Sequence, residues 1–324
     1  MRLKALLTIA STLAFPAGLA TYSKYRRELN QRVQSVETGG LIADTAAGPI
    51  EYAEAGEGQP LLLIHGAGGG YDQGLLVARD FGPGYRVIAP SRFGYLGTPI
   101  PDDPSIAAQA AAHLALLDHL NIHRCIVAGV SAGAPSAVEL ALRHPDRVSA
   151  LILLVPRTYD PSQAIGPDKG LQSQAVLRVV ETSADFLFWL AIKLARASVV
   201  RFLGVPPELE AAASPEERAR VTEVMRSILP LSRRAGGLLV DGNARIDPWP
   251  LDQICTPTLI VSAQDDLYNT LPGARFTASG VPGAELKILE SGGHLMVGQA
   301  EQVQAWVSDF LHRASDHDLL RSAA

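Results

Sequence analysis

Short apolar runs alternate with longer helical patterns from about residue 41 onward, and this alternation predicts a sheet covered by helices. The apolar runs of strand length are 41–43, 50–53, 60–64, 85–89, 125–128, 148–155, 258–262 and 284–289. The helical patterns are 105–120, 134–143, 272–279 and 299–312. Because each helical pattern is long enough to cross between parallel strands, we expect a mostly parallel, eight-stranded sheet flanked by helices.

One segment breaks this alternation, because residues 157–250 separate two predicted strands by far more than a crossover needs. It contains an apolar helical stretch at 174–202 and a charged stretch at 215–226. We interpret the segment as a helical lid inserted over one end of the sheet. The expected organisation is therefore an N-terminal segment at 1–34, a core formed by 35–156 and 251–313, the lid at 157–250 and a tail at 314–324.

The N-terminal segment carries an uncharged, mostly apolar run from Ala5 to Tyr22, with basic residues on both sides. Its length lies between the apolar core of a signal peptide and that of a membrane-spanning helix, and small residues precede Thr21 as at a cleavage site. The run has no polar face, which argues against a helix of the globular domain. We expect residues 1–34 to be a membrane anchor or signal peptide, and the protein to be membrane-anchored or exported.

Composition and charge argue against a disordered chain, a nucleic-acid partner and a metal site. Hydrophobic residues make up 47% of the 324 residues and charged residues 19%, which indicates a folded chain with a sizeable core. A net charge of -5 argues against a nucleic-acid partner, because a phosphate backbone requires a basic patch. Cys125 and Cys255 lie beside predicted strands and are expected to be inert core residues. No histidine and cysteine cluster has metal-ligand spacing, so we expect no metal site.

The strongest chemical signal is the sequence Gly129-Val130-Ser131-Ala132-Gly133, which follows a predicted strand and precedes a predicted helix. In this context the pattern predicts a nucleophile elbow, a sharp turn that lifts a serine hydroxyl out of the sheet. The glycines let the chain approach itself without a clash, and the N-terminus of the next helix favours negative charge on a substrate oxygen. The alternative is a glycine-rich turn with an incidental serine, which the flanking strand and helix disfavour.

A second signal is the stretch His65-Gly66-Ala67-Gly68-Gly69-Gly70, directly after a buried predicted strand. An oxyanion hole needs two backbone amides, and the elbow supplies one from Ala132, so this loop is expected to supply the other from Ala67. His65 is a candidate base, but a histidine before such a loop is more often a structural hydrogen-bonding residue. No lysine followed by serine or threonine closes the loop, which argues against a phosphate-binding loop.

Candidate partners of Ser131 follow two later strands. Asp265 and Asp266 come after the strand predicted at 258–262, and His294 comes after the last predicted strand. Because the C-terminal ends of parallel strands share one edge of a sheet, we expect these residues to meet there. The order serine, aspartate, histidine is the one found in enzymes of the α/β-hydrolase fold.

These motifs resemble those of the α/β-hydrolase superfamily from about Leu41 to Leu311. Within it, the elbow, the His-Gly loop and the lid position look like the branch of lidded esterases, lipases, cofactor-free haloperoxidases and C–C bond hydrolases. The resemblance implies an α/β-hydrolase fold and supports Ala67 as an oxyanion donor. Serine at position 131 argues against the haloalkane dehalogenase and epoxide hydrolase branches, whose elbow carries aspartate.

The resemblance also selects among the candidate acids. The acid of this superfamily is usually the fourth residue of a Gly-x-x-Asp turn, which favours Asp266 although Ala263 replaces the glycine. Asp265 and Asp160 are the alternatives, the latter because some relatives place the acid after the preceding strand. A second departure is the stretch from Ser91 to Thr98, where serine replaces the usual aspartate and the two glycines are one residue further apart.

The mechanism implied by the resemblance is acyl transfer without a cofactor. Ser131 attacks a carbonyl carbon, His294 accepts its proton, Asp266 orients the imidazole, and the amides of Ala67 and Ala132 hold the oxyanion. A small carboxylic ester is the expected substrate, with an apolar acyl or aromatic group if the apolar lid residues 186–190 face the site. The alternatives are C–C bond cleavage or haloperoxidase-like chemistry with the same triad, or a ligand-binding protein with little turnover.

Overall fold

An eight-stranded sheet forms the centre of the computed structural model, which describes residues 2–162 and 184–322. The strands are β1 (Leu41–Thr45), β2 (Gly48–Ala55), β3 (Gln59–Ile64), β4 (Tyr85–Pro90), β5 (Cys125–Val130), β6 (Val148–Leu154), β7 (Thr258–Ala263) and β8 (Glu285–Leu289). Their order is β1-β2-β4-β3-β5-β6-β7-β8. The β1–β2 and β2–β4 pairs are antiparallel and the other pairs are parallel. The predicted sheet is therefore confirmed.

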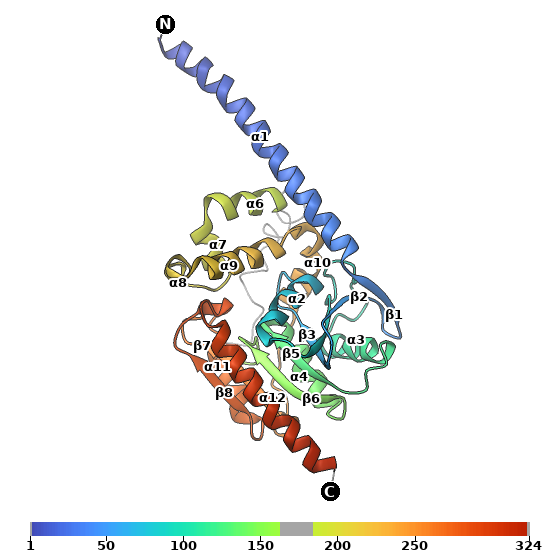
Figure 1. The fold of residues 1–324 in the computed structure, drawn as a ribbon. Helices are drawn as coiled ribbons and strands as arrows, with labels where there is room; N and C mark the ends of the chain where they lie inside the picture. The colour runs from blue at the N-terminus through green and yellow to red at the C-terminus, as the bar shows by residue number, and fades with distance from the viewer. Residues whose placement is uncertain (1, 163–183, 323–324) are drawn as a thin grey trace.

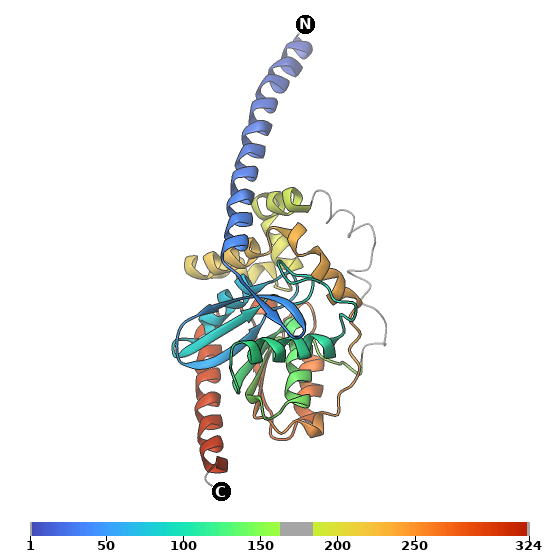
Figure 2. The ribbon, with the colours of Figure 1, turned by 90° about the vertical axis from the view of Figure 1, so that its right-hand side faces the viewer.

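Helices cover both faces of this sheet, which is why the central strands are apolar at successive positions (Figure 2). One face carries α3 (Ile106–His119), α4 (Ala134–Arg143) and α11 (Leu271–Gly280), and the other carries α2 (Tyr71–Ala78) and α12 (Ala300–Ser322). In β3, Leu62 and Ile64 pack with the first set and Leu61 and Leu63 with the second. The helices on both faces fix the register of β3 and hold the strand ends that carry the candidate residues.

The inserted segment forms α6 (Ala184–Leu194), α7 (Arg196–Phe202), α8 (Pro207–Ala212), α9 (Pro215–Ser227) and α10 (Ala235–Asn243). Figure 1 shows these helices beyond the C-terminal ends of the central strands. Residues such as Trp189, Val200 and Met225 give them a small apolar core of their own. The charged stretch at 215–226 forms most of α9, and of the stretch 174–202 the part before residue 184 lies outside the described residues. The role of the segment as a lid stays a prediction.

The N-terminal helix α1 (Arg2–Thr38) extends away from the sheet at its start and runs beside α6 near its end (Figure 1). Tyr25 and Leu29 are buried in one apolar cluster with Trp189, so the helix packs on the inserted segment beyond the apolar run at 5–22. Among the residues that the structure describes, no helix is both long enough and apolar enough to span a membrane. The membrane anchor or signal peptide stays a prediction.

Two features differ from the sequence expectations. Helix α2 was not predicted, because it has only eight residues and begins after Gly70, without a side chain that caps its first amides. Cys255 was expected in the core together with Cys125, and this prediction was wrong. Cys125 is buried at the start of β5, whereas Cys255 is exposed because the apolar run of β7 begins only at Thr258.

Candidate active site

Ser131 lies at a sharp turn between β5 and α4, in a 3-10 turn over Ser131–Gly133. Its φ angle is 49°, in the left-handed region that residues with a side chain rarely adopt. A Cβ atom at Gly133 would lie 2.5 Å from the carbonyl oxygen of Ile64, and one at Gly129 would lie 2.8 Å from the Cα atom of Ala134. Only glycine fits at these two positions, so the sequence pattern folds as the elbow that it predicts.

The structure brings Ser131, His294 and Asp266 together in one chain of hydrogen bonds. The Nε2 atom of His294 lies 2.8 Å from Ser131 Oγ, and its Nδ1 atom lies 2.8 Å from Asp266 Oδ2. Because a carboxylate only accepts, Nδ1 carries the proton and Nε2 is free to accept one from the serine. His294 and Asp266 are both buried, which strengthens their interaction. This is the geometry that a general base needs to activate a hydroxyl.

The carboxylate of Asp266 is held in its ionised form. Burial alone would raise its pKa, but hydrogen bonds outweigh burial and place the pKa below its usual value. The donors are His294, the hydroxyl of Thr270 at 2.5 Å and the amide of Tyr268 at 2.9 Å. A permanent negative charge at Asp266 stabilises the imidazolium that forms when His294 accepts a proton.

Asp265 performs a different task that the sequence did not reveal. Its two oxygens accept hydrogen bonds from the amides of Gly292 and Gly293, at 3.2 and 2.8 Å. These amides directly precede His294, so Asp265 supports the loop that carries the imidazole without contacting it. An aspartate followed by a second aspartate gives no hint of this division of labour.

Asp160 contacts a serine of its own turn. Its Oδ1 atom accepts hydrogen bonds from the amide and the hydroxyl of Ser162, at 2.8 and 2.6 Å, in a local turn at the start of the inserted segment. Of the three candidate acids, the geometry therefore favours Asp266 as the partner of His294.

The inserted segment touches both loops that carry these residues. The carbonyl oxygen of Gly204 accepts hydrogen bonds from the amides of His294 and Leu267, each at 3.0 Å. The ring of Tyr268 meets the imidazole of His294 edge to face, with 4.7 Å between ring centroids, and its hydroxyl donates to the carbonyl of Phe202. Any displacement of the chain around Gly204 would therefore change the position of the imidazole.

His65 is fully buried and has a structural environment. Its Nε2 atom accepts a hydrogen bond from the amide of Arg92 at 3.0 Å, and its Nδ1 atom donates to the carbonyl of Gly66 at 2.7 Å. Burial and the charge of Arg92 hold the pKa of His65 well below its usual value. With both nitrogens occupied and the ring neutral, His65 fits the interpretation as a hydrogen-bonding residue better than a base.

The two expected oxyanion donors lie on either side of the nucleophile. Ala132 follows Ser131 directly, and Ala67 follows Gly66, at which a Cβ atom would lie 3.3 Å from the Cβ atom of Ser131. Ala67 is exposed, and its amide makes no hydrogen bond to any residue that the structure describes. The geometry agrees with an oxyanion hole at Ala67 and Ala132, which stays a prediction.

Comparison with known proteins decides the family. Residues 59–300 match the family model described as alpha/beta hydrolase fold. The chain belongs to this family. The family includes the branch that the sequence motifs resemble, as the names of individual relatives show.

Two relatives are each 29% identical to this hydrolase. One is a 2-hydroxy-6-oxononadienedioate/2-hydroxy-6-oxononatrienedioate hydrolase of Paraburkholderia xenovorans, matched over 81% of this chain and 90% of the relative. The other is a 2-hydroxymuconate semialdehyde hydrolase of Pseudomonas putida, matched over 88% and 98%. A solved alpha/beta hydrolase fold protein from Nakamurella multipartita is also 29% identical, with a TM-score of 0.66 over 85% of this chain and 99% of its own.

A buried ion pair supports the loop at residues 65–70 of this hydrolase. The guanidinium of Arg92 contacts both oxygens of Asp241 on α10, at 2.6 and 2.7 Å, and donates to the carbonyls of His65 and Gly66 at 3.0 and 3.2 Å. The hydroxyl of Tyr95 donates to the same carboxylate at 2.5 Å. These contacts connect the inserted segment to the expected oxyanion loop, and no sequence motif indicates the role of Asp241.

The loop after β4 is stabilised by a carboxylate from another strand. Glu51 on β2 accepts hydrogen bonds from the hydroxyl of Ser91 at 2.7 Å and from the amide of Gly97 at 3.0 Å. Its own amide donates to the hydroxyl of Thr98 at 2.9 Å, and Leu96 takes up the additional length with a φ angle of 50°. Glu51 thus holds both ends of the loop from Ser91 to Thr98.

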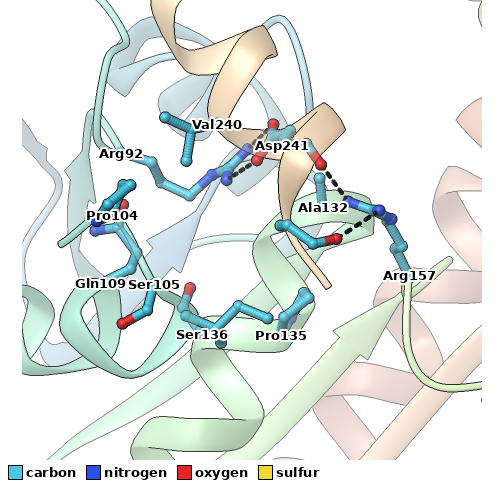
Figure 3. A pocket seen from close by; sticks show the side chains of 12 residues that line it. Arg92, Pro104, Ser105, Gln109, Ala132, Pro135, Ser136, Arg157, Val240 and Asp241 are labelled. Carbon is cyan, nitrogen blue, oxygen red and sulfur yellow. Dashed lines mark hydrogen bonds and ion pairs between the residues drawn. The ribbon is translucent and has the colours of Figure 1, made fainter. Parts of the chain in front are cut away.

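A cavity of about 30 Å³ lies beside the elbow, between α4 and α10 (Figure 3). Ala132 lines it from the elbow, Pro135 from α4 and Val240 from α10. The guanidinium of Arg157 also lines the cavity and donates to the carbonyls of Asp241 and Ala244 at 2.8 and 3.3 Å. A space of this size holds one or two water molecules or a small group of a substrate.

Acid sensitivity is expected from His113, which is buried on α3 with Nε2 3.2 Å from the hydroxyl of Ser136. Burial and the charge of Arg92 lower the pKa of His113 to about 3. Below about pH 6.5 the unfolded chain binds a proton at this residue that the folded chain does not, so the stability present above that pH is lost as the pH falls toward 3.

We expect the free energy of unfolding to fall less between about pH 7.5 and pH 5.5 in His113→Gln than in the unaltered chain, by about 1 kcal/mol. Urea unfolding at the two pH values measures this difference. His119→Gln is the matched control, because His119 is exposed on the same helix. An identical pH dependence in His113→Gln and the unaltered chain would contradict the prediction.

Proposed function

We propose that this hydrolase cleaves a carboxylic ester through an acyl-enzyme formed on Ser131. The observation that carries the proposal is the pair of 2.8 Å contacts that link Asp266, His294 and Ser131 Oγ. The contacts supply a nucleophile, a base and a fixed negative charge behind the base. An ester needs only these groups and water.

In the proposed reaction, Ser131 Oγ bonds to the carbonyl carbon of the ester while its proton passes to His294 Nε2. The carbonyl oxygen becomes an oxyanion, which the amides of Ala67 and Ala132 stabilise. The tetrahedral species collapses, the bond to the alcohol oxygen breaks, and His294 returns the proton to that oxygen. Water then attacks the acyl-enzyme with the same proton transfers in reverse order, which releases the acid and restores Ser131.

The apolar character of the substrate is supported by residues beside His294. The ring of Tyr268 lies against the imidazole and exposes 50% of its surface, so an apolar acyl or aromatic group would cover it. Leu267 precedes Tyr268, and the carbonyl of Phe202 accepts from the Tyr268 hydroxyl; these two residues expose 44% and 63% of their surface. Residues 186–190 of α6 contribute differently. Phe186 and Trp189 pack against Tyr25 of α1, which favours a role of this stretch in holding the inserted segment and α1 together.

A fluorophosphonate probe and a panel of p-nitrophenyl esters of increasing acyl length test the proposal. We expect one equivalent of probe on Ser131, found by peptide mass, and a burst of p-nitrophenol that equals the amount of labelled enzyme. Cleavage of none of the esters, together with no adduct on Ser131, would overturn the proposal. A ligand that binds tightly without any burst would instead indicate a binding protein.

C–C bond cleavage is the second candidate, because relatives matched over most of their length bear the names of C–C bond hydrolases at 29% identity. The same triad geometry is compatible with either reaction. The disappearance of 2-hydroxymuconate semialdehyde, followed by absorbance, gives a value of kcat/KM to set beside that of the best ester. A value for the semialdehyde about 100-fold higher would replace the ester proposal by this one.

We also propose that the apolar run at 5–22 attaches the protein to a membrane or directs its export. The support is its uncharged sequence between basic flanks and the extension of α1 away from the sheet (Figure 2). Fractionation of the full chain and of a chain that starts at residue 24 tests the attachment. N-terminal sequencing of the mature protein shows whether the segment is removed. Recovery of the uncleaved full chain in the soluble cytosolic fraction would contradict both alternatives.

A further inference from the structure

Arg234, which directly precedes α10, is fully buried. Its guanidinium donates to the carbonyl of Gly69 and to both oxygens of Asp72 on α2, at 3.2 and 2.9 Å. A buried guanidinium is tolerated only where carboxylate and carbonyl groups replace water around it. The contact therefore fixes one end of the glycine-rich loop that carries Ala67 to the start of α2.

The other end of the loop is fixed by Arg92, whose guanidinium donates a hydrogen bond to the carbonyl of Gly66 at 3.2 Å. The carbonyl of Gly66 and the amide of Ala67 belong to one planar trans peptide unit, in which they point in opposite directions. Holding the carbonyl toward Arg92 therefore turns the amide of Ala67 away from it. Together, Arg92 and Arg234 determine the position and direction of the expected oxyanion donor.

The N-terminal helix joins this arrangement through Arg32. Its guanidinium lies 2.7 Å from Asp72 Oδ2, the same oxygen that accepts from Arg234. A second contact fastens the helix nearby, because the hydroxyl of Tyr71 donates to the carbonyl of Val36 at 3.0 Å. A continuous series of polar contacts thus runs from α1 through Asp72 and Arg234 to the glycine-rich loop.

We infer that Arg32 of α1 is a positioning residue for the oxyanion loop and acts through Asp72 and Arg234. The N-terminal helix then contributes to turnover, in addition to the membrane attachment or export proposed for its apolar run. The inference rests on the proposed function. Without Arg32, Asp72 keeps Arg234 as its cationic partner within the described part of the chain, and its carboxylate can turn, which loosens Arg234 and the carbonyl of Gly69. A displaced donor reduces stabilisation of the transition state more than it reduces substrate binding.

The test compares Arg32→Gln with Arg27→Gln in the full chain. Arg27 is exposed on the same helix and makes no hydrogen bond to a described residue, so the two variants lose the same charge. Per active site titrated with fluorophosphonate, we expect Arg32→Gln to lower kcat for a p-nitrophenyl ester about fivefold to tenfold with KM nearly unchanged, and Arg27→Gln to change neither. Inhibition by a trifluoromethyl ketone, which forms an oxyanion adduct, should weaken by the same factor, and Arg32→Lys should restore most of kcat.

Equal kcat values per active site in Arg32→Gln and Arg27→Gln would overturn the inference. A lower titratable fraction with normal kcat per site would also overturn it, because that result describes folding alone. Ser131→Ala, measured in parallel, distinguishes failure of the proposed function from failure of the role of Arg32. If Ser131→Ala retains turnover, the proposed function fails, whereas an inactive Ser131→Ala beside a fully active Arg32→Gln defeats only the role of Arg32.

Discussion

Ser131→Ala is expected to lower kcat for ester hydrolysis by a factor on the order of 10⁴ to 10⁶, the range found when the nucleophile of a serine hydrolase is removed. The loss is large because His294 and Asp266 can assist only a nucleophile that is present. Ester hydrolysis and fluorophosphonate labelling measure the effect. The fold should persist, because the substitution removes a single hydroxyl at the end of β5.

Ser279→Ala provides the matched control, since Ser279 lies exposed on α11 and its hydroxyl donates only to the carbonyl of Phe276, at 2.8 Å. This variant should label and turn over like the unaltered chain. Labelling of Ser131→Ala, or ester hydrolysis at an undiminished rate, would mean that another residue is the nucleophile.

Local patterns made the elbow and the strand ends predictable. Gly129 and Gly133 are needed because the turn brings backbone atoms within contact distance, and that requirement is written into five consecutive residues. The sheet edge then places Asp266 and His294 near Ser131, because all three follow parallel strands of the same sheet. Each of these inferences uses only neighbouring residues and a general rule of sheet topology.

The supports of the site could not be predicted, because they join residues far apart in the sequence. Arg92 and Asp241 are 149 residues apart, and Arg234 lies 162 residues after Asp72. Neither pair belongs to a motif, and an arginine in a polar loop is most often a solvated residue. Only Arg92 gave any signal, through its place in the unusual stretch from Ser91 to Thr98.

The packing of α1 was missed for a related reason. Its first part is apolar on all sides, which drew the interpretation toward a membrane or an export signal. The contacts that fasten the helix come later, from isolated residues such as Tyr25, Glu28 and Arg32 among exposed polar neighbours. Their partners lie on α2 and α6, and no periodic pattern indicates them.

The acid is best tested by comparing Asp266→Asn, Asp265→Asn and Asp160→Asn in one series. Asp266→Asn should lower kcat by a factor of about 10⁴, because an amide can donate to Nδ1 of His294 and so favour the tautomer whose Nε2 carries the proton. That tautomer cannot accept a proton from Ser131. The pKa of Asp266 is already below its usual value, so its carboxylate is ionised at neutral pH.

The other two variants calibrate this result. Asp265→Asn should lower kcat only about tenfold, because its remaining oxygen can still accept from one of the two glycine amides that precede His294. Asp160→Asn should leave kcat nearly unchanged, since its carboxylate accepts hydrogen bonds from Ser162 in a turn at the start of the inserted segment, whereas Asp266 is the carboxylate bonded to His294. Each rate is divided by the number of sites that fluorophosphonate titrates, and thermal unfolding checks the fold. If Asp266→Asn turns over at a near-normal rate while Asp265→Asn or Asp160→Asn does not, the acid is the residue whose replacement abolishes activity, and the hydrogen bond between Asp266 and His294 serves the fold alone.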